Sequence, residues 1–371
     1  MSSNSEHRSH LHFPDDEPTS DTSDGRSVST SAGITHTSSG KALALAMEKL
    51  NYHPVIVFGH SNSGKTTLLL SLIAFLKTDA LAAIGIRLGQ PMLDLTQSDG
   101  LEMWERAQRI FGINTQAFID GTAPDATATR VPFFVPLVIS PSGGEEVRLA
   151  LMDSNGEWYA PNPESPAYYP ELRPQLRDFF INYSGRLSLL HVLPRTQLTV
   201  NGDGSGHADD RRMLQNADSA LRGAIDEYNK HRADRSDDAH MMLVTKWDAQ
   251  ALAHGQALAQ VLVDNAQAVR AFIKTNAPQA FTSLEAIRTH TRSLELRAYC
   301  AGRIDGKQLR YPLSNSDLDA VIRDYPRQLW RWLYRQASDG KELPLPPPPQ
   351  RPWYERWSSY ILDMLFPQSG R

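Results

Sequence analysis

The sequence predicts a three-layer α/β fold in which helices cover both faces of a mostly parallel sheet. Short apolar runs typical of buried strands alternate along the chain with longer stretches of helical periodicity. Two of the runs, 131–139 and 147–152, are separated only by a turn, so they are expected to form an antiparallel hairpin. Pro132 and Pro136 remove hydrogen-bond donors from the first run, which places this antiparallel strand at an edge of the sheet.

The other predicted elements follow from the period of their apolar residues. Compact apolar runs predict strands at 55–58, 187–193, 241–244 and 294–299. Apolar residues three and four apart predict helices at 41–50, 65–76, 99–112, 206–231, 249–275 and 316–336. Strands that alternate with helices favour parallel pairing.

The composition predicts five parts. Residues 1–40 are mostly Ser, Thr, Asp and His, so they are expected to form a disordered tail that cannot bury enough apolar surface to fold. The α/β region is expected over 41–305, with a C-terminal helical segment over 306–340. Residues 341–352 form a proline-rich linker, either a stiff spacer or a ligand for an aromatic groove. An amphipathic helix over 353–371 would pack on the domain or dock a partner.

Composition and charge exclude several classes of protein. Of the 371 residues, 40% are hydrophobic and 22% charged, as in soluble globular proteins. A net charge of −4 argues against a general nucleic-acid binder. The single cysteine, Cys300, excludes an internal disulfide and suits a reducing cytosol. Without a secretory signal or an apolar stretch of membrane-spanning length, the protein is expected to be cytoplasmic, or at most attached to a membrane surface.

Residues 59–66 read Gly-His-Ser-Asn-Ser-Gly-Lys-Thr, a complete G-x-x-x-x-G-K-[ST] motif between a predicted strand and a predicted helix. Glycines let consecutive backbone N–H groups curl around a phosphate, and the helix presents its positive end to the phosphate. Lys65 can reach the β and γ oxygens, and Thr66 can bind Mg²⁺. The alternative is a glycine-rich turn that happens to carry a lysine. The fold is therefore predicted to be a P-loop NTPase sheet, with phosphate-binding residues Gly59, His60, Ser61, Asn62, Ser63, Gly64, Lys65, Thr66 and Thr67.

A second candidate lies at the end of the strand over 147–152, which continues as Asp153-Ser154-Asn155-Gly156. A carboxylate at a strand's carboxyl end, beside the P-loop, can hold Mg²⁺ directly or through water. The N–H of Gly156 can approach a γ-phosphate, and the glycine permits a hinge. The motif is short, and the alternative is an ordinary turn.

The third candidate is Thr245-Lys246-Trp247-Asp248, directly after the strand over 241–244. With the P-loop and Asp153, it resembles the regulatory P-loop GTPase superfamily in its small-GTPase-like branch, whose guanine-reading motif is [NT]-K-x-D. The resemblance implies that Asp248 accepts bonds from guanine N1–H and the exocyclic amine. It also implies that Lys246 lies along the base plane and that Thr245 braces the P-loop. The alternative is a solvated loop.

The resemblance covers roughly residues 50–305, with four of five motifs in the family's order. Because this region is longer than a minimal small GTPase, the resemblance implies helical insertions at about 98–120, 157–185 and 200–235. Cys300 and Ala301 are similar to the S-A-K loop, whose backbone N–H meets guanine O6, although Cys replaces Ser and Gly302 replaces Lys or Leu. The fifth motif, a switch-I threonine that binds Mg²⁺, is ambiguous between Thr122, Thr127 and Thr129; Thr127 and Thr129 are favoured because they lie closest to the strand. More narrowly, the chain resembles a bacterial family in which some members act beside a second GTPase.

The resemblance implies a GTP-binding switch with GTP or GDP and Mg²⁺ as cofactors. Many family members place a glutamine after the D-x-x-G glycine to orient water, whereas this chain has Glu157. A second negative charge beside a triphosphate is unfavourable, so hydrolysis is expected to be slow or stimulated by a protein partner. The expected catalytic residues are Lys65, Gly156 and Glu157. Two alternatives are an ATP-dependent enzyme or kinase with the same P-loop, and a nucleotide-binding scaffold that does not cycle.

Overall fold

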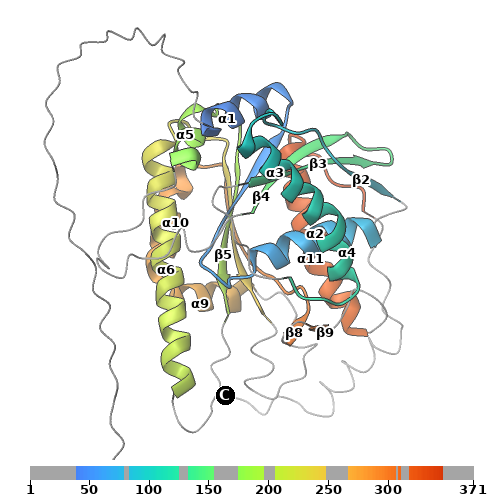
Figure 1. Cartoon of the computed structure of the whole chain (residues 1–371). Helices are drawn as coiled ribbons and strands as arrows, with labels where there is room; N and C mark the ends of the chain where they lie inside the picture. The colour runs from blue at the N-terminus through green and yellow to red at the C-terminus, as the bar shows by residue number, and fades with distance from the viewer. Residues whose placement is uncertain are drawn as a thin grey trace, which may run out of the picture. The chain divides into compact units, whose positions relative to one another are not determined.

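Seven strands form one sheet in the order β2-β3-β4-β1-β5-β6-β7 in the computed structural model of the chain (Figure 1). All the described residues belong to one structural unit, Thr37–Arg371. The structure describes residues 39–78, 83–124, 133–153, 174–195, 205–247, 266–305, 308–310 and 317–345.

The predicted fold class is confirmed, because the sheet is mostly parallel. Strands β4, β1, β5, β6 and β7 pair parallel, whereas β3 runs antiparallel to both β2 and β4. The hairpin of β3 and β4 is the one that the sequence predicts. The bounds are β1 His53–Phe58, β2 Ile84–Leu88, β3 Phe133–Pro141, β4 Val147–Asp153, β5 Ser188–Pro194, β6 Ala239–Thr245 and β7 Ser293–Ala298. A separate two-stranded sheet joins β8 (Arg303–Asp305) to β9 (Gln308–Arg310).

The edge of the sheet differs in one respect from the sequence prediction. Strand β2, which the sequence analysis does not identify, lies outside β3, so β3 is the second strand from the edge. Pro136 is tolerated there because its carbonyl accepts from Gly89 N–H on the β2 side, at 2.8 Å. Its missing N–H points to the same side, where β2 has already ended at Leu88.

Helices cover both faces of the sheet (Figure 1). One layer contains α2, α3, α4 and α11, and the other contains α1, α5, α6, α9 and α10. A π-helical turn (Ile110–Asn114) joins α3 to α4. The bounds are α1 Ser39–Lys49, α2 Lys65–Thr78, α3 Ser98–Arg109, α4 Thr115–Ile119, α5 Pro174–Asn182, α6 Ser205–His231, α9 Ala266–Asn276, α10 Pro278–Ile287 and α11 Asp317–Ala337.

Four of the six predicted helices agree closely with the structure at both ends. Helices α1, α2, α6 and α11 lie within two residues of their predicted bounds at each end. The helix predicted over 249–275 is described only from Ala266, as α9, and α10 is a separate helix that the sequence analysis does not identify. Among the described helices, none has both the length and the apolar composition needed to cross a bilayer.

Two close contacts fix helices in these layers. Helix α1 crosses α5 at Gly40, where a Cβ would overlap the carbonyl oxygen of Gln175. Glycine is therefore required for this backbone-to-backbone approach. On the opposite layer, Trp330 of α11 donates from Nε1 to the Leu72 carbonyl of α2 at 2.8 Å. The C-terminal helix is thus held against the helix that follows the P-loop.

Two buried histidines face each other on neighbouring strands of the sheet. Nε2 of His191 on β5 lies 3.1 Å from Nδ1 of His240 on β6, and the two rings are stacked with centroids 5.3 Å apart. The rings of Phe58 and Tyr228 pack around them. Burial lowers the pKa of His191 to about 3 and also lowers the pKa of His240 well below its ordinary value. Both rings are therefore neutral in the folded protein at pH 7.

We predict that acid destabilises the protein partly through this pair. Because the pKa of His191 is lowered on folding, its contribution to the free energy of unfolding is complete above about pH 6.5 and is lost as the pH falls toward about 3. Each such histidine contributes a slope of about 1.4 kcal/mol per pH unit within that window. His191→Gln should therefore reduce the slope of the free energy of unfolding against pH by about that amount between pH 6 and 4, measured by urea unfolding. The same exchange at exposed His290 is the control, and an unchanged slope in the His191 variant would contradict the prediction.

Candidate functional site

The predicted phosphate-binding loop joins β1 to α2 at the carboxyl edge of the parallel strands. Two positions in the loop have left-handed backbone conformations, Asn62 with φ 61° and Gly64 with φ 89°. At Gly59, a Cβ would lie 2.6 Å from Ser63 Oγ and 2.9 Å from the Val192 carbonyl oxygen. Both glycines of the motif are therefore needed for the shape of the loop.

Lys65 lies inside the curve of this loop. Its Nζ donates to the carbonyls of Gly59, at 2.8 Å, and His60, at 3.0 Å, and only 7% of the residue is exposed. Burial lowers the pKa of Lys65 to about 8, although the nearby carboxylate of Asp153 acts in the opposite direction. The loop thus encloses an ammonium group that a phosphate oxygen would stabilise better than two neutral carbonyls.

Thr66 and Asp153 bring two oxygen ligands together beside Lys65. The Thr66 hydroxyl donates to the Asp153 carboxylate, with Oγ1 3.3 Å from Oδ1 and 3.2 Å from Oδ2, and Asp153 is 1% exposed. No group of three or more His, Cys, Asp or Glu that could hold a metal occurs in the described part of the chain. One carboxylate and one hydroxyl suit Mg²⁺, which usually keeps several waters and takes further ligands from a bound phosphate.

Thr245, at the end of β6, contacts the phosphate-binding loop directly. Its hydroxyl donates to the Ser63 carbonyl at 2.5 Å, and a weaker contact reaches the Leu193 carbonyl at 3.4 Å. Thr245 is buried, so this bond is shielded from water. The next residue, Lys246, has φ 56°, which turns the chain sharply at the sheet edge. The T-K-W-D segment therefore begins against the loop, as a bracing role for Thr245 requires.

Arg195 is part of this edge but has no counterpart in the sequence predictions. Its guanidinium lies 4.2 Å from the Trp247 ring centroid and 4.9 Å from that of Phe272. The backbone N–H of Arg195 donates to the Thr245 carbonyl at 2.9 Å. Burial lowers the pKa of Arg195 to about 10. Trp247 itself is 2% exposed, so it is a packing residue that holds the turn after Thr245. An arginine at the end of a strand carries no signal in the sequence. The role of Arg195 follows only from its contacts in the folded chain.

Cys300 and Ala301 lie beside the same turn. The N–H of Tyr299 donates to the Val244 carbonyl at 2.8 Å, and the N–H of Trp247 donates back to the Tyr299 carbonyl at 3.3 Å. Both Cys300 and Ala301 are buried, at 1% and 8% exposed. The P-loop, Asp153, the Thr245 turn and the Cys300 turn all follow strands of one parallel set, so they lie at one edge of the sheet.

Several predicted site residues lie outside the described part of the chain: Thr127, Thr129, Gly156, Glu157 and Asp248. The third switch-I candidate, Thr122, is described. It forms an antiparallel bridge with Gln308, and its N–H donates to the Ala117 carbonyl at 2.8 Å.

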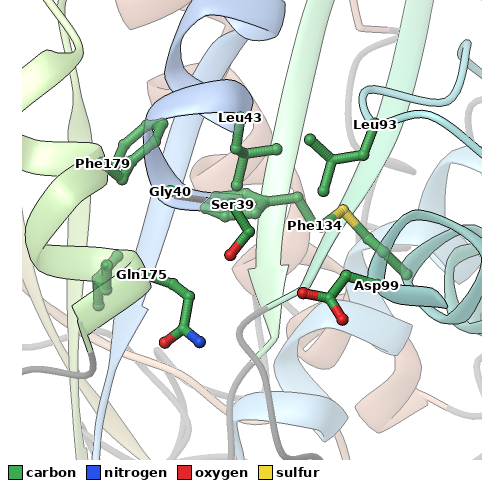
Figure 2. A pocket seen from close by; sticks show the side chains of 10 residues that line it. Ser39, Gly40, Leu43, Leu93, Asp99, Phe134, Gln175 and Phe179 are labelled. Carbon is green, nitrogen blue, oxygen red and sulfur yellow. The ribbon is translucent and has the colours of Figure 1, made fainter. Parts of the chain in front are cut away.

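A small apolar cavity lies between α1, α3, α5 and the start of β3 (Figure 2). Leu43, Phe134 and Phe179 form much of its wall, with Ser39, Asp99 and Gln175 at its polar side. The cavity holds about 20 Å³, which is room for one water. Phe134 pairs with Met152, the residue before Asp153, so the cavity is near the site but far too small for a nucleotide.

No protein-family model and no curated protein sequence matches the chain. Among solved structures, a chain of the signal recognition particle receptor SRb-GTP/SRX complex from Chaetomium thermophilum is similar to it with a TM-score of 0.30 and 13% identity. The similarity covers 76% of this chain and 98% of that chain. A likeness this weak carries no argument about ligand or activity. The order and direction of the strands are consistent with a P-loop NTPase-like fold.

We predict that Thr245→Val destabilises the protein by about 1–3 kcal/mol, because the exchange keeps the side-chain volume but leaves the buried Ser63 carbonyl without its hydroxyl donor. Urea unfolding would measure the loss. Thr245→Ser, which keeps the hydroxyl, is the matched control and should lose less. Equal stability of the valine variant and the native chain would show that this bond does not hold the loop.

Proposed function

We propose that the protein is a GTP-binding switch whose Mg²⁺-dependent hydrolysis of GTP is slow or depends on a partner. The observation that carries the proposal is the hydrogen bond from Thr245 to Ser63, which joins the first residue of the proposed base-reading segment to the phosphate-binding loop. A nucleoside triphosphate has both phosphates and a base, so a loop that binds phosphate beside a segment that binds a purine would suit it.

Lys65 and the backbone of the loop would hold the phosphates. The ammonium of Lys65 donates to the Gly59 and His60 carbonyls. A triphosphate would replace these carbonyls with β and γ oxygens, which carry negative charge and accept stronger hydrogen bonds. Main-chain N–H groups from His60 to Thr67 and the start of α2 would complete the cradle.

Thr66 and Asp153 would hold Mg²⁺ with GTP or GDP, and Thr127 or Thr129 is the proposed third protein ligand. The bound ion would neutralise charge on the β and γ phosphates. The two described oxygen groups already lie within hydrogen-bond distance of each other, so little rearrangement is needed for both to reach one cation.

Asp248 is the proposed reader of guanine, because a carboxylate accepts from both N1–H and the exocyclic amine, and adenine has no such pair of donors. Lys246 would lie along the base, and the backbone N–H groups of Cys300 or Ala301 would meet O6. The buried Trp247, which packs against Arg195, supports this assignment because it holds the chain in place directly before position 248 in the sequence.

Hydrolysis would use Lys65, Gly156 and Glu157. Glu157 occupies the position at which a neutral glutamine would orient water. Its negative charge repels that of the γ-phosphate and so disfavours the transition state for hydrolysis. We therefore assign partner dependence to the reaction, with a protein partner or a second GTPase supplying a cation. A cytoplasmic location is part of the same proposal.

The first test is Asp248→Asn in the full chain. Loss of the charged acceptor should weaken GTP binding by about 10- to 100-fold, equivalent to one or two strong hydrogen bonds. Xanthosine triphosphate should gain affinity, because the amide supplies a donor where the base now presents an acceptor. Calorimetry measures both, with ATP competition as the control. Displacement of GTP by micromolar ATP from the native chain would refute guanine recognition.

The second test is Glu157→Gln, measured by single-turnover hydrolysis with excess protein. Removing the negative charge should accelerate the intrinsic reaction by roughly 10-fold, within the range of a single electrostatic contribution to a transition state. Lys65→Met, which removes the phosphate ligand, should abolish hydrolysis and serves as the background. Fast turnover by the native chain without a partner would contradict the proposed role of Glu157.

A further inference from the structure

Tyr299 lies where three parts of the carboxyl edge meet. It follows β7 directly and precedes Cys300, and only 2% of the residue is exposed. Its phenol oxygen lies 2.5 Å from Oγ of Ser71, on the helix that follows the phosphate-binding loop. The two residues are 228 positions apart in the sequence, so no local pattern connects them.

The tyrosine is the donor in this contact. Ser71 has one hydroxyl hydrogen, and it donates that hydrogen to the Leu68 carbonyl of α2 at 2.8 Å. Burial raises the pKa of Tyr299 above its ordinary value, so the phenol keeps its proton at neutral pH. Two hydrogen bonds in series therefore connect the Tyr299 side chain to the backbone of α2, and both are shielded from water because Ser71 is 1% exposed.

The main chain of Tyr299 is bound to the neighbouring strand end. Its N–H donates to the Val244 carbonyl at 2.8 Å, and its carbonyl accepts from the Trp247 N–H at 3.3 Å. A single residue thus connects the turn after β6, the turn at Cys300 and the helix that begins at Lys65.

The separation between the Cys300 turn and α2 matters when one nucleotide binds to both. Under the proposed function, the start of α2 holds the phosphates and a backbone N–H of Cys300 or Ala301 meets O6 of the base. Base and phosphates are covalently joined, and a hydrogen bond weakens steeply when its geometry departs from the ideal. A side chain that sets this separation therefore changes the binding of the base without touching it.

We infer that Tyr299 is a positioning residue for guanine, whose hydroxyl bond to Ser71 holds the Cys300 turn at the distance from α2 that lets a backbone N–H reach O6. This role rests on the proposed function, because it requires a purine at the turn. The alternative is a packing role, since the Tyr299 ring lies 6.1 Å from the ring of Tyr325 on α11, measured between centroids. Packing changes the stability of the domain, whereas positioning changes the preference for a base over phosphates alone.

Tyr299→Phe in the full-length chain tests this role, because the ring remains and only the hydroxyl is lost. GTP should bind about 3- to 10-fold more weakly, equivalent to one hydrogen bond. Inorganic triphosphate with Mg²⁺ should bind as it does to the native chain, and so should 2-aminopurine riboside triphosphate, which lacks O6. Ser71→Ala should reproduce the loss for GTP, and the double variant should bind GTP no more weakly than either single variant. Calorimetry measures these affinities.

Tyr183→Phe is the matched control. Its hydroxyl is also buried, and it donates to the Tyr52 carbonyl at 3.2 Å, next to the start of β1. The control should lose stability but keep the native ratio of GTP affinity to triphosphate affinity. An unchanged ratio in Tyr299→Phe, with a native chain that prefers GTP to ATP, would overturn the role of Tyr299 and leave the proposed function standing.

Hydrogen exchange without nucleotide separates the two possible failures. Amide exchange over residues 297–301 should be about 3- to 10-fold faster in ligand-free Tyr299→Phe and unchanged in Tyr183→Phe. Unchanged exchange in Tyr299→Phe would overturn the link between the turn and α2, whichever nucleotide binds. Equal binding of GTP and ATP by the native chain would refute the proposed function, and the positioning of guanine with it, even where exchange is faster.

Discussion

The hydrogen bond from the Thr245 hydroxyl to the Ser63 carbonyl links two loops that the chain separates by 182 positions. Strand β5 lies between β1 and β6, so the bond spans the width of one strand at the carboxyl edge. Together with the backbone bonds from Arg195 to Thr245 and from Trp247 to Tyr299, it holds the loop around Lys65 and the turn at Lys246 in one arrangement. Because Ser63 and Thr245 are both buried, removing the hydroxyl donor from the Ser63 carbonyl would cost free energy, which makes the arrangement stiff. The geometry of the whole edge depends on this stiffness.

The central strands were predictable because burial on both faces leaves an unambiguous apolar run. Strand β2 was not, because only alternate residues are covered: Ile84 is buried whereas Gly85 and Arg87 are exposed. Its extended conformation comes from pairing with β3 rather than from its own composition.

Helix α10 also depends on a contact with another element. Its first turn is capped from another helix, since Asp218 of α6 accepts from the N–H of Ala280 at 2.8 Å, and local sequence carries no sign of this.

Some residues of the candidate site can be predicted from local sequence, whereas others can be identified only from contacts in the folded chain. The phosphate-binding loop is a contiguous motif, so its residues and its glycine conformations follow from local sequence alone. The meeting of Thr66 with Asp153 follows once both are placed after parallel strands. Arg195 could not be found, because its importance lies in a stack on Trp247 and Phe272 that brings together three separate elements. Sequence therefore identifies the groups that would touch a ligand better than the groups that hold them.

The crossing of α1 and α5 at Gly40 has a mechanical consequence for the layer that these helices share. Their main chains are in direct contact at Gly40, with no side chain between them, so neither helix can easily slide past the other. A shift of α5 would be transmitted to α1 almost without loss. Helix α5 is the first described element after β4, the strand that ends at Asp153, so α1 and α5 form one stiff pair in this helical layer.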